Sequence, residues 1–274
     1  RIINGCVLPE KIETPDFDTS KLKHIQKEDE TQSTIPEKEL QFLKWMANYY
    51  HYPLGKLIFE TRPNKENKRN INIPFYFGED KPLDFSLNEI QQSITDKIKV
   101  NEGFQKYLIH GVTGSGKSAI YLKKIIENYR NNKSALFLLP EINLTPQFIQ
   151  FFKAHTKYKI LVYNSSLTKS KKKKIWDVLD QEKGPFLIIG VRSSIFLPLK
   201  DLGIIVIDEE HDSSFKQDDR CPYNARDVAI KKAHLFDIPI ILGSATPSLE
   251  TYKNFIHTEN YFELKDRAQI GRLP

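Results

Sequence analysis

The stretch KYLIHGVTGSGKSAIYLKKIIENYR, residues 106–130, decides the fold of this chain of 274 residues. Residues 106–110 are an apolar run, residues 111–118 are rich in glycine, and residues 118–130 have the apolar spacing of a helix. Between a strand and a helix, such a loop lets backbone N–H groups curl around a phosphate chain at the positive end of the helix. The stretch therefore predicts a strand, a phosphate-binding loop and a helix.

The loop fits the pattern G-x-x-x-x-G-K-[ST] without a mismatch. In this pattern Lys117 reaches the β- and γ-phosphates of a nucleotide, and the hydroxyl of Ser118 binds the accompanying Mg²⁺. A glycine-rich turn without a ligand is the alternative. The residues predicted to bind the nucleotide are Gly111, Val112, Thr113, Gly114, Ser115, Gly116, Lys117 and Ser118.

Further apolar runs indicate that the rest of the sheet is parallel. They lie at 134–139, 159–163, 186–190, 203–208 and 238–243, and most are separated by segments long enough for a helix. Continuously apolar strands that alternate with helices are typical of a parallel sheet covered on both faces. The predicted fold class is therefore α/β, with ligands at the carboxyl ends of the strands.

Three consecutive carboxylates, Asp208, Glu209 and Glu210, follow the apolar residues 204–207. One interpretation is a strand that leaves the core into a solvated turn. The other is a cation at the strand end, because nucleotide-bound Mg²⁺ takes one or two carboxylates. With the glycine loop, this predicts Asp208 as a magnesium ligand and Glu209 as the group that orients or deprotonates the attacking water. We expect residues 111–118 and 208–210 to lie on neighbouring strand tips and to share one pocket.

Three more polar segments follow apolar strands. In GSATPSLET, Ser244 and Thr246 could bind the acidic cluster and pass its state to a bound strand, although an ordinary helix cap is the alternative. In LLPEINLTPQ, Thr145 is a predicted helix cap, and the helix N-terminus suits a nucleic-acid phosphate. In GVRSSIFLP, Arg192 and Ser193 could have the same role.

Composition sets broader limits. The formal net charge of +6 is compatible with a polyanionic partner but does not require one. Two distant cysteines, Cys6 and Cys221, fit a reducing cytoplasm, and no run approaches the roughly 20 apolar residues of a membrane span. The lysine-rich run at 168–176 is interpreted as a solvated helix start, with a DNA-backbone patch as the alternative.

At this point the motifs indicate a family. GVTGSGKS, LLPEINLTPQ, GVRSSIFLP, IDEEHDSSFKQ, YNARDVA and LGSATPSLET, in this order, resemble the PriA family of bacterial replication-restart helicases, of superfamily 2 and the DExH type. The resemblance covers residues 83–274 closely and 1–62 more weakly. It implies a RecA-like P-loop lobe that binds ATP and Mg²⁺, preceded by part of a 3′-DNA-end-binding domain.

The resemblance also implies roles for single residues. Gln91, in LNEIQQ, is the expected adenine contact. Residues 211–227 are similar to an aromatic-rich loop that couples single-stranded DNA to hydrolysis, with Phe215 and Tyr223 as its rings and Arg226 in the adjoining motif. Stacking of such rings on bases would be worth roughly 1–3 kcal/mol per base. The alternative is that these rings pack on the lobe.

The domain organisation predicted from the resemblance has four parts. They are a partial DNA-binding domain (1–62), a linker (63–82), helicase lobe 1 (83–264) and the approach to a second lobe (265–274). The arginine fingers of a second lobe and the zinc-binding cysteines of the family have no match here, so zinc is expected only in a further C-terminal part. We therefore expect a fragment that binds nucleotide and DNA but hydrolyses ATP poorly, since an arginine finger is typically worth roughly 10³–10⁵ in rate.

For the whole protein, the resemblance implies ATP hydrolysis coupled to 3′-to-5′ translocation on single-stranded DNA. The implied partners are single-stranded and forked DNA, primosome proteins and single-stranded-DNA-binding protein, with no membrane, and the implied location is the cytoplasm. Alternatives are another superfamily 2 translocase, a non-enzymatic module that binds ATP or DNA, and a P-loop kinase or GTPase. The last is disfavoured because the acidic and SAT segments follow the loop and no NKxD segment occurs. A preference for forked DNA with a free 3′ end would distinguish the implied helicase from another superfamily 2 translocase.

Overall fold

The computed structural model describes residues 35–62, 73, 75–83, 85–182 and 184–268. In this part of the chain the main sheet has eight strands in the order β1-β4-β5-β3-β6-β9-β2-β10. All neighbours pair in parallel except β1, which is antiparallel to β4. In sheet order, the strands are β1 (Tyr76–Phe77), β4 (Lys159–Tyr163), β5 (Phe186–Gly190), β3 (Ser134–Leu138), β6 (Leu202–Ile207), β9 (Ile240–Ser244), β2 (Lys106–Gly111) and β10 (Tyr261–Leu264).

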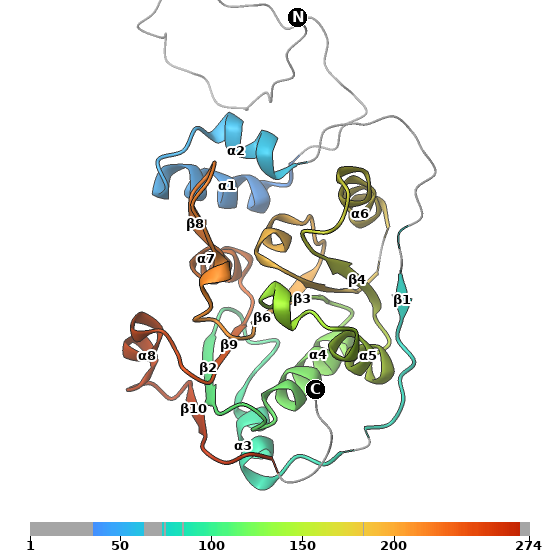
Figure 1. The fold of residues 1–274 in the computed structure, drawn as a ribbon, viewed down its shortest axis with the longest axis vertical. Helices are drawn as coiled ribbons and strands as arrows, with labels where there is room; N and C mark the ends of the chain where they lie inside the picture. The colour runs from blue at the N-terminus through green and yellow to red at the C-terminus, as the bar shows by residue number, and fades with distance from the viewer. Residues whose placement is uncertain (1–34, 63–72, 74, 84, 183, 269–274) are drawn as a thin grey trace, which may run out of the picture.

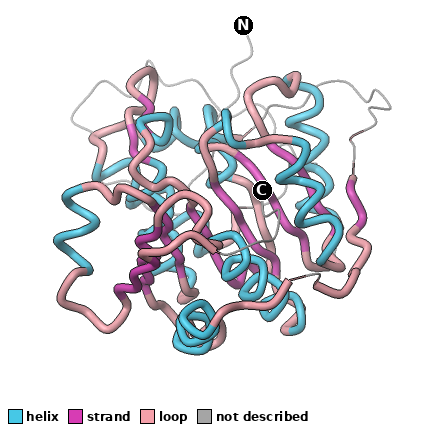
Figure 2. Tube along the Cα trace, turned by 60° about the horizontal axis from the view of Figure 1, so that its bottom comes forward, coloured by secondary structure: helices cyan, strands magenta, loops and turns pink. Residues whose placement is uncertain are grey.

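Helices cover both faces of this sheet, which confirms the predicted α/β class (Figure 2). One face is covered by α3 (Glu89–Lys97), α4 (Lys117–Arg130) and α5 (Pro146–His155). The other is covered by α1 (Glu37–Tyr49), α2 (Leu54–Thr61), α6 (Lys169–Gln181), α7 (Ala225–Phe236) and α8 (Leu249–Phe255). Short 3₁₀ turns η2 (Glu141–Asn143), η3 (Arg192–Phe196) and η4 (Ser213–Phe215) follow β3, β5 and β6.

The two layers explain why the strands are apolar throughout. Successive side chains of a strand point to opposite faces of the sheet. In β3, Leu136 and Leu138 accordingly belong to one hydrophobic cluster and Ala135 and Phe137 to the other. Because helices cover both clusters, neither set of positions can be polar, and the strand has no alternating pattern.

Strands lie at all six predicted positions, with ends that differ by at most two residues. The prediction missed the two edge strands, β1 and β10. Residues 76–77 of the predicted linker form β1, so the linker is not free of regular structure. A hairpin of β7 (Lys216–Gln217) and β8 (Tyr223–Asn224) also lies within the predicted aromatic-rich loop.

The described helices of the N-terminal part, α1 and α2, pack directly on the lobe. Phe42 and Met46 of α1 are fully buried in the same hydrophobic cluster as the strands. The ammonium group of Lys232 in α7 lies 3.0 Å from the carboxylate of Glu39 and also donates to the carbonyl of Ile195 at 2.9 Å. Figure 1 shows α1 and α2 beside β8 and α7. The lobe therefore supplies the core on which these two helices fold.

Some predictions fall on residues outside the described part, namely 1–34, most of the linker and 269–274. Within the described part, no helix has the length and apolarity needed to cross a membrane.

Candidate active site

The glycine loop has the backbone that its sequence predicts. Gly114 and Gly116 have φ values of 79° and 85°, in the left-handed region where a side chain is strained. A Cβ on Gly116 would also lie 2.3 Å from Nε2 of Gln91, so a side chain there would displace that amide. Gly116 is the N-cap of α4 and provides no side-chain cap. No side chain of the N-cap residue therefore covers the start of α4, and such a helix N-terminus suits an anion.

Polar side chains of the loop are arranged as a phosphate site requires. Lys117 is buried and its Nζ donates to the carbonyl of Gly111 at 2.7 Å. The hydroxyl of Ser115 is buried without a hydrogen-bond partner among the described residues. A buried unpaired hydroxyl is costly unless a ligand satisfies it. Ser118 follows, partly exposed, in the first turn of α4. These groups fit a bound nucleotide phosphate chain.

Asp208 lies directly beyond β6, and its N–H donates to the carbonyl of Leu138 on β3 at 2.9 Å. The hydroxyl of Tyr121 on α4 donates to Oδ1 of Asp208 at 3.0 Å. Burial raises the pKa of the Asp208 carboxyl to about 6, while the positive charge of Lys117 opposes this rise and the charge of Glu209 adds to it. A carboxylate in this setting is stabilised by a nearby cation. The residues thus fit a magnesium ion accompanying a nucleotide.

The two motifs share one edge of the sheet, but the prediction that their strand tips are neighbours is wrong. Strand β9 lies between β6 and β2. The motifs approach each other across Gly243 of β9, where a Cβ would lie 1.5 Å from Oη of Tyr121 and 3.1 Å from Oδ1 of Asp208. Only a residue without a side chain allows the Tyr121–Asp208 hydrogen bond to span this strand.

Glu209 sits in a strained turn next to Asp208. Its φ is 51°, which is uncommon for a residue other than glycine. Its carboxylate lies 3.6 Å from Nδ1 of His211, and that ring nitrogen is 2.7 Å from the hydroxyl of Ser244. The N–H of Thr246 in turn donates to the Ser244 hydroxyl at 2.9 Å. Ser244 therefore bonds to His211 rather than to a carboxylate of the acidic cluster, and the predicted role of Ser244 and Thr246 in passing the state of that cluster to a bound strand stays a prediction. Neither Ser244 nor Thr246 caps a helix, because the N-cap of α8 is Ser248.

Two models of known protein families match this chain. Residues 88–255 match the family model described as DEAD/DEAH box helicase. The chain belongs to the DEAD/DEAH box helicase family. Residues 1–63 match a second model, described as 3′DNA-binding domain (3′BD). Both lobe motifs of the helicase, the glycine loop and the acidic turn, lie within the first match.

Curated relatives agree with this assignment. The chain is 39% identical to the replication restart protein PriA of Rickettsia felis over 86% of its own length, and 38% identical to that of Rickettsia prowazekii over 94%. The predicted resemblance to the PriA family is thereby confirmed. The chain spans only 36% and 39% of the length of these two relatives. Among solved structures, RecG bound to a three-way DNA junction is 23% identical with a TM-score of 0.49, covering 70% of this chain and 25% of that one.

Gln91 is buried against the glycine loop of the helicase lobe. Its Nε2 donates to the carbonyl of Ser115 at 2.8 Å, and its Oε1 accepts from the N–H of Asn88 at 3.0 Å. The Asn88 side chain accepts from the N–H of Gln91 at 2.8 Å, which completes a capping box at the start of α3. The amide of Gln91 thus links α3 to the loop, and its predicted contact with adenine stays a prediction.

Some of the predicted DNA-coupling residues are exposed, and others are bonded to neighbouring groups of the protein. Thr145 is exposed and caps α5, with its hydroxyl accepting from the N–H of Phe148 at 3.2 Å, so the predicted cap is confirmed. The guanidinium of Arg192 instead donates to backbone carbonyls of Ser214 (3.2 Å) and Lys216. Arg192 therefore holds the segment that follows the acidic turn.

Both rings of the predicted aromatic-rich loop are inside the protein. Phe215 is 1% exposed and Tyr223 is 5% exposed, and Tyr223 packs edge-on against Phe196 with ring centroids 5.3 Å apart. In this conformation neither ring offers a face to a base, so the geometry agrees with packing on the lobe. Arg226 is also engaged, at 3.1 Å from Oε2 of Glu210 and 2.9 Å from Oδ1 of Asp227.

Sequence reasoning missed two residues of the site, Tyr121 and Gly243. A usable signal existed for Tyr121, because it lies four residues after Lys117 and so shares its helix face. Gly243 is the next-to-last residue of the apolar strand β9, at the edge where the motifs lie, and a glycine within a strand often marks a close approach of another group.

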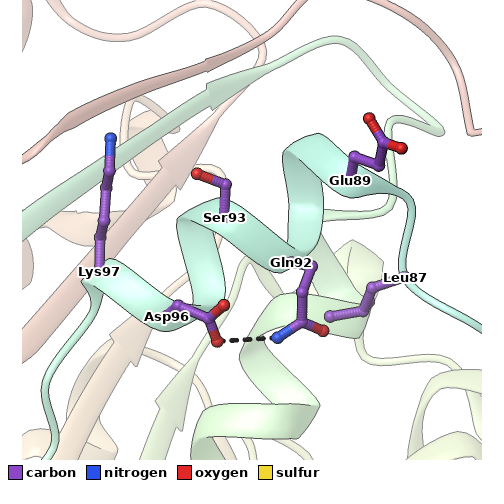
Figure 3. A pocket seen from close by; sticks show the side chains of 6 residues that line it. All are labelled: Leu87, Glu89, Gln92, Ser93, Asp96 and Lys97. Carbon is purple, nitrogen blue, oxygen red and sulfur yellow. Dashed lines mark hydrogen bonds between the residues drawn. The ribbon is translucent and has the colours of Figure 1, made fainter.

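A surface hollow of about 600 Å³ lies on α3. It is lined by Leu87, Glu89, Gln92, Ser93, Asp96 and Lys97, on the outer side of α3 (Figure 3). Gln92 donates to Asp96 there at 2.8 Å. None of its lining residues belongs to the glycine loop or the acidic turn.

Proposed function

We propose that the chain is the nucleotide-binding lobe of an ATP-dependent DNA helicase of replication restart, with part of a DNA-end-binding domain before it. The observation that carries this proposal is that α4, which begins at Lys117, is joined to Asp208 at one sheet edge by the 3.0 Å hydrogen bond from the hydroxyl of Tyr121. The glycine loop leads into α4 beside them, and no side chain caps the start of that helix. A lysine, a helix N-terminus and a carboxylate together suit a triphosphate with its magnesium ion.

Each residue of the site has a distinct task in this proposal. Lys117 leaves the carbonyl of Gly111 to bind the phosphate chain, and the Ser115 hydroxyl gains a partner there. Asp208 and the hydroxyl of Ser118 would hold Mg²⁺, which when bound neutralises charge on the phosphates. Glu209 is next to Asp208 and orients the water that attacks the γ-phosphate. Tyr121 holds the Asp208 carboxylate in place.

The DNA part of the proposal rests on similarity. Relatives covering most of this chain are replication restart proteins, and residues 1–63 match a 3′DNA-binding domain. This supports single-stranded and forked DNA as the substrate in the cytoplasm, with 3′-to-5′ translocation and primosome proteins as further parts of the same proposal. The exposed helix N-terminus capped by Thr145 lies at the carboxyl edge and suits a DNA phosphate.

We further propose that the chain binds ATP but turns it over slowly by itself. The relatives are much longer, since this chain spans 36% of the Rickettsia felis protein. An arginine from a second lobe is typically worth roughly 10³–10⁵ in rate. A module that binds nucleotide without hydrolysis is the alternative function, and both versions require the same nucleotide site.

Substitution of Lys117 tests that site. In a titration with a fluorescent ATP analogue and Mg²⁺, Lys117→Ala should weaken binding at least about 100-fold, because bonds to charged groups are worth about 1.5–3 kcal/mol each. Lys123→Ala, on the same helix and partly exposed, is the matched control and should bind like the wild type. Thermal unfolding of both variants checks that the lobe is intact. Unchanged ATP affinity in Lys117→Ala would reject the proposed function.

A further inference from the structure

The lysine-rich start of α6 has no part in the proposed nucleotide site. As the sequence predicts, a helix begins within residues 168–176, with Thr168 as its N-cap and Lys169 as its first residue. The first six residues of this helix include five lysines, which we call the α6 lysine cluster: Lys169, Lys171, Lys172, Lys173 and Lys174. The apolar side of α6, with Ile175, Val178 and Leu179, packs in the core. The cluster therefore needs an explanation of its own.

Local helix stability does not explain the cluster, because its charges oppose the helix dipole. The N-terminal end of a helix carries a partial positive charge, so acidic residues are favoured there and basic residues at the other end. Helix α6 has no acidic residue in its first turn and no basic residue in its last turn. Like charges three or four residues apart, such as Lys171 and Lys174, also repel each other. The order of charges along α6 is therefore the reverse of the stabilising one.

Most of the charge of the cluster is not neutralised by the protein. Among the described residues, only Lys173 of the cluster has a carboxylate partner, Asp177 at 3.0 Å. The next carboxylates along the chain are paired with lysines outside the cluster, in the pairs Asp180–Lys200 (3.9 Å) and Glu182–Lys159 (3.0 Å). Lys169 and Lys174 are exposed, and Lys171 is partly exposed. These three ammonium groups are therefore available to an anionic partner.

The aromatic rings beside the cluster are covered by cations of the protein itself. Tyr163 is buried, and Nζ of Lys172 lies 5.7 Å from its ring centroid. Trp176 is partly buried, and the guanidinium of Arg62 lies 5.7 Å from its ring centroid. Sites for single-stranded nucleic acid combine charge with rings on which bases stack, whereas duplex DNA is held largely through its phosphates. The cluster offers charge without such a ring and therefore suits duplex DNA.

The cluster lies at the same sheet edge as the nucleotide site but far from it. Strand β4, which precedes α6, is parallel to β5 and ends at Tyr163. Four strands separate β4 from β2, whose end leads into the glycine loop. Since neighbouring strands are about 4.8 Å apart, the ends of β4 and β2 are roughly 24 Å apart. Through Arg62, the C-cap of α2, α6 contacts the region that matches a 3′DNA-binding domain (Figure 1).

We propose that the α6 lysine cluster binds the phosphate backbone of duplex DNA, as a contact separate from the nucleotide site. Of the two alternatives for the lysine-rich run, this assigns the DNA-backbone patch. The inference rests on the proposed function in one respect, because that function supplies DNA as the ligand. A fork has duplex arms beside its single strand, so one chain can hold both. Lysines that cost helix stability are then retained because they bind phosphates.

The salt dependence of binding tests this proposal on the chain itself. Affinity for a short, blunt-ended fluorescent DNA duplex is measured over a range of salt concentrations, for the wild type and for the triple variant Lys169→Gln, Lys171→Gln and Lys174→Gln. Each lysine that contacts a phosphate contributes about 0.9 to the slope of log affinity against log salt concentration. The triple variant should therefore lose about 2–3 from this slope and bind the duplex at least about tenfold more weakly at low salt.

The matched control removes three exposed lysines at the opposite edge of the sheet, Lys97→Gln, Lys99→Gln and Lys133→Gln. These lysines lie at the end of α3 and just before β2 and β3. The control lowers the net charge as much as the first triple variant does, and it should keep the wild-type slope. A second triple variant with arginine at positions 169, 171 and 174 keeps the charge and should also keep the slope.

Two further measurements separate DNA binding from folding. Because the cluster opposes the helix dipole, the glutamine variant at positions 169, 171 and 174 should unfold at the wild-type temperature or above it. Its affinity for the fluorescent ATP analogue should stay within about twofold of the wild type, because the cluster is distant from the nucleotide site. A residue with a purely structural role would instead lower the unfolding temperature when it is replaced.

Several outcomes would overturn the proposal, and they differ from failure of the proposed function. An unchanged slope in the folded glutamine variant rejects the cluster as a DNA contact, and so does an equal loss of slope in the control. A loss of slope that is as large for oligo(dT) as for the duplex rejects duplex DNA as the ligand. A wild-type chain that binds the ATP analogue but no duplex rejects the cluster and leaves the nucleotide site standing. Conversely, full ATP affinity in Lys117→Ala would reject the proposed function without changing the result for the cluster.

Discussion

We call the sheet edge that carries the glycine loop and the acidic turn the nucleotide edge. It differs from residues 211–224, which follow it in the chain, in what holds the key side chains in place. At the nucleotide edge, backbone conformation fixes the groups: Gly114 and Gly116 are left-handed, and Lys117 starts a helix. In residues 211–224, hydrophobic packing places the side chains, and the rings of Phe215 and Tyr223 are buried in the core.

This difference shows what a motif can predict. A pattern of glycines at fixed spacing specifies a backbone path, and the path then places the lysine. An aromatic residue in a loop specifies nothing about its exposure, because the same ring can stack on a ligand or fill the core. The glycine motif therefore predicted the backbone of its loop, whereas the aromatic residues of the other segment did not predict that their rings are buried.

The largest expected effect comes from Phe215. Because its ring is 1% exposed within the main hydrophobic cluster, Phe215→Ala should lower the free energy of unfolding by about 3–5 kcal/mol, as measured by urea denaturation. Phe77→Ala, where the ring is 62% exposed on β1, is the control and should stay within about 0.5 kcal/mol. A Phe215→Ala chain of normal stability that has lost affinity for oligo(dT) would instead assign the ring to DNA.

The same contrast explains how far the sequence alone could go. Six strands were predictable because burial on both faces leaves a continuous apolar run, as in FLIIG of β5. The edge strands β1 and β10 were missed because they are short and mixed: Tyr76 and Phe77 are partly or fully exposed, and Glu263 of β10 is exposed. Edge positions do not carry the burial signal.

Within the site, the residues that belong to a continuous sequence motif were predictable. The residues that connect two motifs from different strands were not. Lys117, Ser118 and Asp208 follow from spacing along the chain. Tyr121 and Gly243 matter only because β9 comes between β2 and β6, and strand order is not written in any one segment. The sequence therefore predicted the phosphate-binding and magnesium-binding residues of this edge, but not the residues that allow the two motifs to contact each other across β9.

Gly243 provides a sharper test of that cross-sheet contact. A methyl group there would lie 1.5 Å from Oη of Tyr121, which is fully buried and cannot move aside, so Gly243→Ala should cost about 1–3 kcal/mol of unfolding free energy and weaken binding of the ATP analogue with Mg²⁺. Gly55→Ala is the control, since a Cβ there meets nothing within 4 Å and α2 should gain up to about 1 kcal/mol.

The double variant Tyr121→Phe with Gly243→Ala tests whether the loss of stability in Gly243→Ala comes from the steric clash with the Tyr121 hydroxyl. Removal of the hydroxyl takes away the atom nearest the new methyl group, so part of the lost stability should return. Nucleotide affinity should stay low because Asp208 has lost its hydrogen bond from Tyr121. Full stability in the single Gly243→Ala variant would mean that the three groups are not packed as described.

The smallest expected effect is that of a substitution at Gln91. This substitution tests whether the nucleotide edge contacts the base of the nucleotide as well as its phosphates. Gln91→Ala removes the donor to the Ser115 carbonyl, a net loss of about 1 kcal/mol, so affinity for the nucleotide should fall by roughly fivefold. Gln92→Ala, one residue along and exposed, should change nothing. Because the Gln91 amide is already bonded to Ser115 and Asn88, we expect ATP and GTP affinities to fall together. If the affinity for ATP fell and the affinity for GTP did not, Gln91 would make the adenine contact that the resemblance implies. The preference of the nucleotide edge for one base would then come from this single side chain.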